Sequence, residues 1–216
     1  MTLSESQIAR ASIWLSLVIC SPSLAAEGKI QERASLSAEA LVADADPNSS
    51  IFRVNPAGGV IHVQSGMSCV LGSKDLSLTK LIIVSGAKPG DDVACDYATP
   101  SGKTTIFATR LNGRNLSTVA ADIFEAMKAT YPNAKLIDGP LVASYPKLRD
   151  PITASIEISG PDGKLVSSAW ISEDQGWIVE VRATYPATDR HDPELFAAIS
   201  SVNARISINK QANQAR

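Results

Sequence analysis

Three consecutive runs between residues 152 and 185 constrain the fold more than any other part of this sequence. In the first run, apolar residues take every second place: Ile152, Ala154, Ile156 and Ile158. A period of two is typical of a strand with one buried face. Runs at 165–171 and 177–185 follow, separated by turn-forming residues at 160–163 and 173–176. The segment therefore predicts a three-stranded antiparallel meander.

Two helical patterns flank the meander. The first follows a cap at Asn115 or Ser117, and its apolar residues recur at helical spacing: Leu116, Val119, Ala120, Ile123, Phe124 and Met127. The second runs from Pro193 to Ile206, with Asp192 as the expected N-cap. Its expected buried stripe consists of Leu195, Ala198, Ile199, Val202 and Ile206.

The remaining segments complete an α+β prediction, a mostly antiparallel sheet flanked by these two helices. Short strand patterns separated by turns fill residues 51–110, and 135–142 is read as one strand interrupted by Gly139 and Pro140. We expect a single domain over 51–208, with a β-rich half at 51–110 and a helix–meander–helix half at 111–208. Residues 27–50 are polar and predict a flexible arm with one helical turn near Ala38–Leu41. Residues 209–216 predict a frayed tail.

The first 26 residues have the order of a secretory signal peptide. Arg10 supplies a positive charge, an apolar run follows from Ala11 to Cys20, and small residues permit cleavage after Ala25 or Ala26. A buried N-terminal helix is the alternative structural interpretation. A lipoprotein signal with Cys20 as the lipidated residue is a further alternative, although Ile19 is bulky for the position before such a cysteine. The expected location is the periplasm or the extracellular space, with no integral membrane segment after cleavage, because no apolar stretch reaches the roughly 18–20 residues of a membrane-spanning helix.

Cys69 and Cys95 remain after removal of the signal peptide. Exported proteins enter an oxidising compartment, so the two cysteines predict a structural disulfide. The bond would close a loop of about 27 residues, and chain entropy assigns such a loop roughly 3.5 kcal/mol. A redox-active pair is usually closer in sequence, as in Cys-x-x-Cys.

Charge and motifs exclude several functions. The 20 basic and 22 acidic residues give a net charge of −2, and no basic run indicates a nucleic-acid partner. The sequence contains no nucleophile-elbow, P-loop or dinucleotide fingerprint, and no zinc-ligand spacing, so we predict no cofactor or metal. The only histidines, His62 and His191, are candidates for catalysis but also fit structural roles. Asp92 and Asp96 lie about 13 Å apart along one strand, too far for a carboxylate pair.

A resemblance covers much of the chain. Ser65, Gly66 and Cys69, the 93–97 segment around Cys95, and the 176–182 strand look like exported proteins of Gram-negative bacteria with no known activity. The arrangement of sheet and helices is also similar to the PsbP-like fold. Neither resemblance carries a functional residue onto this chain, because fold alone does not define function.

These observations predict a non-catalytic exported protein that binds a protein or envelope component in the periplasm. Two alternatives remain open. The first is a hydrolase of unfamiliar type that uses His62 or His191 with a nearby acid and a hydroxyl. The second is a carrier of a small ligand, which requires a cavity between the sheet and a helix.

Overall fold

The computed structural model describes residues 36–48, 50–73, 76–160 and 163–214. Their order is α1 (Ala38–Ala45), β1 (Phe52–Val54), β2 (Val60–His62), β3 (Ser68–Cys69), β4 (Gly72–Ser73), β5 (Leu76–Ile83), β6 (Asp92–Thr99), β7 (Gly102–Arg110), α2 (Leu116–Thr130), β8 (Lys135–Ile137), β9 (Ile152–Gly160), β10 (Gly163–Asp174), β11 (Trp177–Pro186) and α3 (His191–Gln214). The predicted signal peptide and Cys20 lie outside the described residues.

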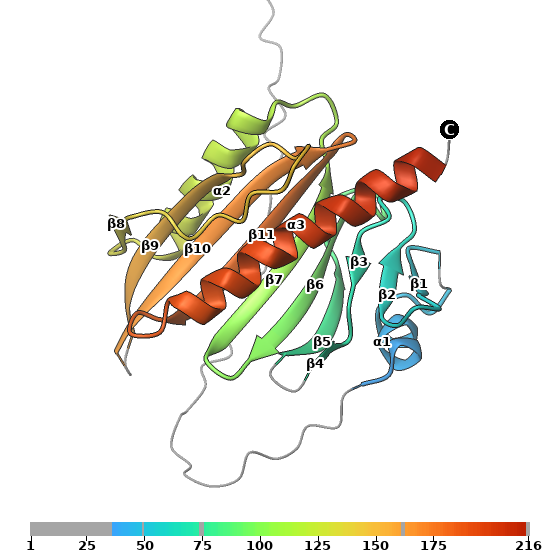
Figure 1. Ribbon diagram of the computed structural model, residues 1–216, viewed down its shortest axis with the longest axis horizontal. Helices are drawn as coiled ribbons and strands as arrows, with labels where there is room; N and C mark the ends of the chain where they lie inside the picture. Colours follow the sequence, from blue (N-terminus) through green and yellow to red (C-terminus); the bar gives the residue numbers. More distant parts are fainter. Residues whose placement is uncertain (1–35, 49, 74–75, 161–162, 215–216) are drawn as a thin grey trace, which may run out of the picture. The chain divides into compact units, whose positions relative to one another are not determined.

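The fold is α+β, as predicted. Strands β1, β2 and β3 form a small sheet, and a larger sheet has the order β4-β5-β6-β7-β11-β10-β9-β8. Every neighbouring pair of strands is antiparallel. The large sheet thus consists of two meanders that meet where β7 pairs with β11 (Figure 1).

The predicted meander is confirmed. Strand β10 pairs with β9 and β11, and the register places Trp170 opposite Val181. Alternation along β11 turns Trp177 and Tyr185 toward the core beneath α3, whereas Ile178 faces α2. Both tryptophans of the meander are buried. One face of the sheet therefore packs against α3 and the other against α2.

Helix α2 has the predicted buried face. The Asn115 side chain caps it by accepting a hydrogen bond from the Thr118 amide. Val119, Ala120 and Met127 are buried against β9, β10 and β11. Leu116, Ile123 and Phe124 also pack against this cluster and are partly buried. The helical periodicity of residues 116–127 was sufficient to predict the buried face of α2, because the sheet face beneath this helix is almost wholly aliphatic.

The predicted buried stripe of α3 is wrong. Leu195 and Ile199 are among the exposed apolar side chains, and of the five expected residues Ala198 alone is fully buried. The side chains that face the sheet are mostly small: Ala197, Ala198, Ser200, Ser201 and Ala204. The large side chains of Trp170 and Tyr185 in the sheet already fill the space beneath α3. Small residues on the helix therefore allow close packing.

The predicted flexible arm is wrong where the structure describes it, whereas the helical turn predicted near Ala38–Leu41 is confirmed as part of a longer helix. Helix α1 occupies Ala38–Ala45, and Leu41 and Val42 are part of the main core. The carboxylate of Asp46 then accepts hydrogen bonds from the backbone amides of Ile51 and Phe52 at 2.6 and 2.9 Å. This segment is ordered because it buries apolar surface and satisfies two amides at the start of β1.

The predicted frayed tail does not begin at residue 209, because α3 continues to Gln214. Near its end, Gln211 donates a hydrogen bond to the carbonyl of Val63 at 3.1 Å. Gly66 has φ +76°, and a Cβ there would lie 2.4 Å from Cβ of Gln211. The C-terminal part of α3 thus packs closely on the small sheet. No helix among the described residues is long and apolar enough to cross a membrane.

Candidate functional site

The predicted disulfide is present. Cys69 in β3 and Cys95 in β6 are bonded, with their Cα atoms 6.3 Å apart. Both residues are fully buried. The bond joins the small sheet to the large one, so its position is structural and inaccessible to a substrate.

His62 lies in the core rather than in an open pocket. Its side chain is 0% exposed and packs edge-on against Trp177, with ring centroids 5.4 Å apart. Nδ1 lies 2.7 Å from Oγ of Ser65. Burial lowers the pKa of His62 to about 4, although the neighbouring Gly90 backbone opposes this shift. The imidazole is therefore neutral at physiological pH.

Asp91 acts electrostatically on His62 but does not complete a catalytic arrangement around it. Asp91 accepts a hydrogen bond from Nε of Arg110 at 2.8 Å, and the Arg110 guanidinium stacks on Trp177, 4.1 Å from the ring centroid. Nε2 of His62 makes no hydrogen bond to any described residue. His62 thus has a hydroxyl partner but neither a carboxylate partner nor access to solvent.

His191 has a carboxylate neighbour but no hydroxyl partner among the described residues. It is exposed at the start of α3, and Nδ1 lies 2.9 Å from Oδ1 of Asp192. The prediction of Asp192 as the N-cap is wrong, because α3 begins at His191 and Asp192 lies within its first turn. No described hydroxyl hydrogen bonds to His191. Neither histidine combines the carboxylate and the hydroxyl that the predicted hydrolase requires.

The two aspartates of β6 are held by cross-strand neighbours. Asp96 accepts a hydrogen bond from Thr105 and forms an ion pair with Lys103 at 2.8 Å. Asp92 accepts a hydrogen bond from Thr109 at 2.9 Å. Burial raises the pKa of Asp92 to about 6, partly offset by this hydrogen bond. The two carboxylates do not share a site, as the spacing predicted.

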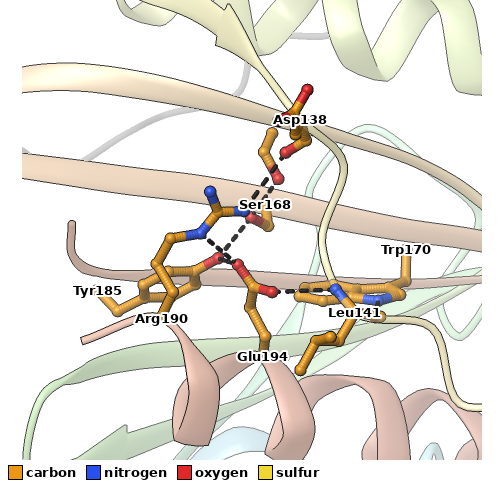
Figure 2. A network of polar contacts seen from close by, with 8 residues as sticks. Asp138, Leu141, Ser168, Trp170, Tyr185, Arg190 and Glu194 are labelled. Carbon is orange, nitrogen blue, oxygen red and sulfur yellow. Dashed lines mark hydrogen bonds and ion pairs between the residues drawn. The ribbon is translucent and has the colours of Figure 1, made fainter. Parts of the chain in front are cut away.

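A polar network fixes the segment that follows β8 (Figure 2). Glu194 of α3 accepts hydrogen bonds from the Tyr185 hydroxyl at 2.7 Å and the Leu141 amide at 3.0 Å. The indole of Trp170 donates to the Leu141 carbonyl at 2.7 Å. Arg190 donates to Glu194 and to the Asp138 carbonyl. Residues 138–141 are thereby tied to both α3 and the sheet.

The electrostatics of this network favour an ionised Glu194. Burial alone would raise the pKa of Glu194, but hydrogen bonds from Tyr185, the Leu141 amide and Arg190 outweigh burial and lower it below its usual value. Burial also raises the pKa of the Tyr185 hydroxyl, so this group remains a proton donor. The network is fully partnered and stabilises the fold rather than activating a nucleophile.

The network positions one end of an apolar groove at the edge of the large sheet. The groove has a volume of about 330 Å³ and lies between α2 and the β8–β9 edge. Its main lining residues are Phe124, Met127, Leu136, Ile137, Ala154 and Ile156, with Gly139 and Thr153 beside the fixed segment. Lys128 is the one charged residue of this lining. The groove therefore combines an apolar interior with one charged residue at its rim.

The sheet edge beside the groove is incompletely paired. Strand β8 is three residues long and pairs with Glu157, Ile156 and Ser155 of β9. Residues 152–154 of β9 have no strand partner on that side within the described chain. Leu136 of β8 is 70% exposed. An exposed apolar edge strand of this kind is a template for pairing with another chain.

Sequence reasoning missed this groove. It read residues 135–142 as one strand, whereas β8 ends at Ile137 and 138–150 contains no further strand or helix. The available signal was the pair Gly139 and Pro140, since proline cannot donate to a strand ladder. The contribution of α2 to the groove depends on tertiary packing and left no local pattern.

No family model matches the sequence, and no curated protein is similar to it. Among the described residues, no group of three or more histidine, cysteine or acidic side chains could hold a metal ion. The candidate site is therefore defined by the geometry of the groove itself.

Proposed function

We propose that the protein is a non-catalytic, exported binding protein, located in the periplasm or secreted, and that it holds an extended segment of another envelope protein in the groove between α2 and β8. The observation that carries this proposal is the apolar groove beside an open, exposed edge strand. Proteins commonly capture extended peptides by adding them as a strand to such an edge.

The backbone of β8 offers the required hydrogen bonds. Residues along a strand alternate in the side to which their N–H and C=O groups point. At least one residue of Lys135–Ile137 therefore directs both groups away from β9. No backbone hydrogen bond outside the β8–β9 ladder engages these residues within the described chain. An added strand would satisfy them.

The lining of the groove selects the chemistry of the ligand. Phe124, Met127 and Ile156 offer a surface for one apolar side chain of the bound segment. Lys128 lies at the rim, where its Nζ forms an exposed ion pair with Glu125 at 3.0 Å. Because such a surface pair is weak, an acidic residue or a terminal carboxylate of the ligand can replace Glu125 as its partner. The proposed ligand is thus an extended segment with an apolar anchor and a negative charge close to it.

Location in an exported compartment is supported by the Cys69–Cys95 bond and by the signal-like composition of the first 26 residues. Disulfides persist in oxidising compartments and are rare in the cytosol. The direct check is the intact mass of protein taken from the cell envelope. A mass that starts at Ala26 or Glu27 supports export, and a full-length mass contradicts it.

The binding proposal is tested with defined peptides. A panel of labelled, alternating apolar–polar peptides with free or amidated C-termini is titrated against the protein by fluorescence anisotropy. We expect Leu136→Asp to weaken binding at least tenfold, about 1.4 kcal/mol, and Lys128→Glu to weaken only the acidic peptides. Val70→Asp is the matched control, because Val70 is a 54% exposed residue distant in sequence from the groove. Equal binding by all variants would refute the assignment of the site.

A carrier of a small apolar ligand is the second candidate, because a volume of about 330 Å³ lies at the lower end of the range of ligand pockets. Amide exchange distinguishes the two. A bound peptide strand protects the outward-facing amides of β8, whereas a fatty-acid probe fills the groove without protecting them. Saturable binding of fatty acid alone, with no protection by any peptide, would favour the carrier.

A further inference from the structure

Helix α3 carries an apolar seam on the side opposite the sheet. The seam consists of Leu195, Ile199, Val202 and Ile206. Leu195 and Ile199 are 42% and 46% exposed, and Val202 and Ile206 are half-buried. The successive spacings of four, three and four residues are those of a helix–helix contact with alternating d and a positions. The described chain provides no second helix to fill these positions.

We propose that this seam is a contact between two copies of the chain, whose α3 helices pack antiparallel about a twofold axis. This inference concerns a different surface from the groove and does not depend on the proposed function. A twofold contact is isologous, so the same patch must be complementary to itself.

The seam meets this requirement. With the axis between Ser200 and Ser201, an antiparallel partner places Ile206 of the second copy opposite Leu195, and Val202 of the second copy opposite Ile199. Each layer therefore pairs one d position with one a position, and all four seam residues are used. A parallel arrangement would instead place identical residues opposite each other.

Charge at the two ends of the seam also favours the antiparallel arrangement. The acidic residue Asp192 is exposed near the beginning of α3, and the basic residue Lys210 is exposed near its end. The same axis brings Asp192 of each copy beside the Asn209–Lys210 turn of the other. Lys210 forms no ion pair with any described residue. Antiparallel helix dipoles add to this attraction.

Apolar surface continues beside the seam. Leu141, Val142 and Tyr145 of the segment after β8 are exposed apolar residues. The Leu141 amide is hydrogen-bonded to Glu194, the residue before Leu195, and Figure 1 shows this segment running next to α3. The contact can therefore extend beyond the helix itself, toward the area that a specific interface needs.

Sedimentation velocity over a concentration series tests the association. We expect the full mature chain to dimerise reversibly below about 1 mM, and Ile199→Lys to shift the midpoint of dimerisation at least tenfold upward. Ile199 is exposed, so the substitution leaves the fold intact, which the circular dichroism spectrum verifies. Val70→Lys places the same charge on another exposed apolar residue and is expected to leave the midpoint unchanged. A chain that remains monomeric up to about 1 mM, or a dimer insensitive to Ile199→Lys, overturns the proposal.

Cysteine crosslinking tests the orientation. Chains carrying Leu195→Cys are mixed with chains carrying Ile206→Cys and oxidised, and the products are identified by mass. The antiparallel arrangement yields the mixed 195–206 disulfide. It excludes the 195–195 product, because eleven helical residues separate those positions by about 16 Å, well beyond disulfide reach. Predominance of 195–195 and 206–206 products would establish a parallel pair and refute the proposed contact.

Discussion

Replacing His62 is expected to remove a defined part of the acid sensitivity of this protein. The side chain is fully buried, hydrogen-bonded to Ser65 and packed against Trp177. An imidazolium in this position would lose its hydration without gaining a carboxylate partner. The native state therefore keeps His62 neutral, whereas the unfolded chain protonates it readily.

The magnitude follows from the two pKa values. The pKa of His62 is about 4 in the native state and 6.5 without burial. As the pH falls below about 6.5, the unfolded state binds the proton first, so the free energy of unfolding declines until the pH reaches about 4. A difference of about two and a half pH units corresponds to about 3 kcal/mol. The contribution is fully present above pH 6.5 and lost below pH 4.

Urea denaturation at several pH values between 7.5 and 4 measures this contribution. His62→Asn places an amide where Nδ1 lies, which preserves a partner for Ser65 but removes the titration. We expect the variant to be less stable than the natural protein at pH 7.5 by roughly 1–3 kcal/mol. As the pH falls to 4, the free energy of unfolding of the variant should rise relative to that of the natural protein by about 3 kcal/mol.

His191→Asn is the matched control. His191 is exposed and lies beside Asp192, so the same substitution there leaves the core unchanged and shows how replacement of a surface histidine alters the stability curve. The carboxylates of the chain are the same in both proteins, so their contributions cancel when the two free energies of unfolding are subtracted. A constant difference between His62→Asn and the natural protein from pH 7.5 to 4 would refute the argument that burial controls this histidine.

Three further substitutions test the supports of the fold. Replacing Cys69 and Cys95 together by alanine should lower the free energy of unfolding by about 3.5 kcal/mol, as their sequence separation of 26 predicts; an unchanged urea midpoint would contradict this. Asp46→Ala should cost about 2–4 kcal/mol because the Ile51 and Phe52 amides lose their acceptor, whereas Asp46→Asn should retain much of that energy; equal losses would argue against the amide contacts. Glu194→Gln should lower the free energy of unfolding by about 2 kcal/mol at pH 7, because it weakens the hydrogen bonds that Glu194 accepts. Because the pKa of Glu194 is lowered below its ordinary 4.5, the advantage of the natural protein should shrink as the pH falls below about 4.5, and a cost that persists at lower pH would exclude an ionised Glu194 as its source.

The features predictable from the sequence were those encoded by neighbouring residues. The alternation from Ile152 to Tyr185 defined the meander and the two faces of β11. Asn115 and the apolar stripe predicted α2 correctly, because the large apolar residues of this helix are the ones that pack against the sheet. Cys69 and Cys95 were the two cysteines outside the predicted signal peptide, so their pairing required no geometric information.

Other features depended on what lies across the core. In α3, periodicity favoured Leu195 and Ile199 as buried, but Trp170 and Tyr185 already fill the space beneath the helix, which accepts small residues instead. Helix α1 is ordered because Leu41 and Val42 are buried in the main core, a contact that its own sequence does not specify. Asp46 then accepts hydrogen bonds from the amides of Ile51 and Phe52. The groove forms because α2 and β8 lie side by side, and no residue pattern within either element predicts that tertiary contact.

The large sheet joins its two meanders through one long-range pairing. Arg110 in β7 lies opposite Trp177 in β11, 67 residues later, and the ladder continues to Lys103 opposite Thr184. Within each meander the strands pair across shorter connections, of which residues 138–151 between β8 and β9 are the longest. The β7–β11 pairing requires a much longer chain segment to be ordered first. The rate of folding should therefore depend on the β7–β11 encounter. Until β7 and β11 pair, each half presents an unpaired edge strand, so this is also the place where the folding chain is most prone to mispair with other chains.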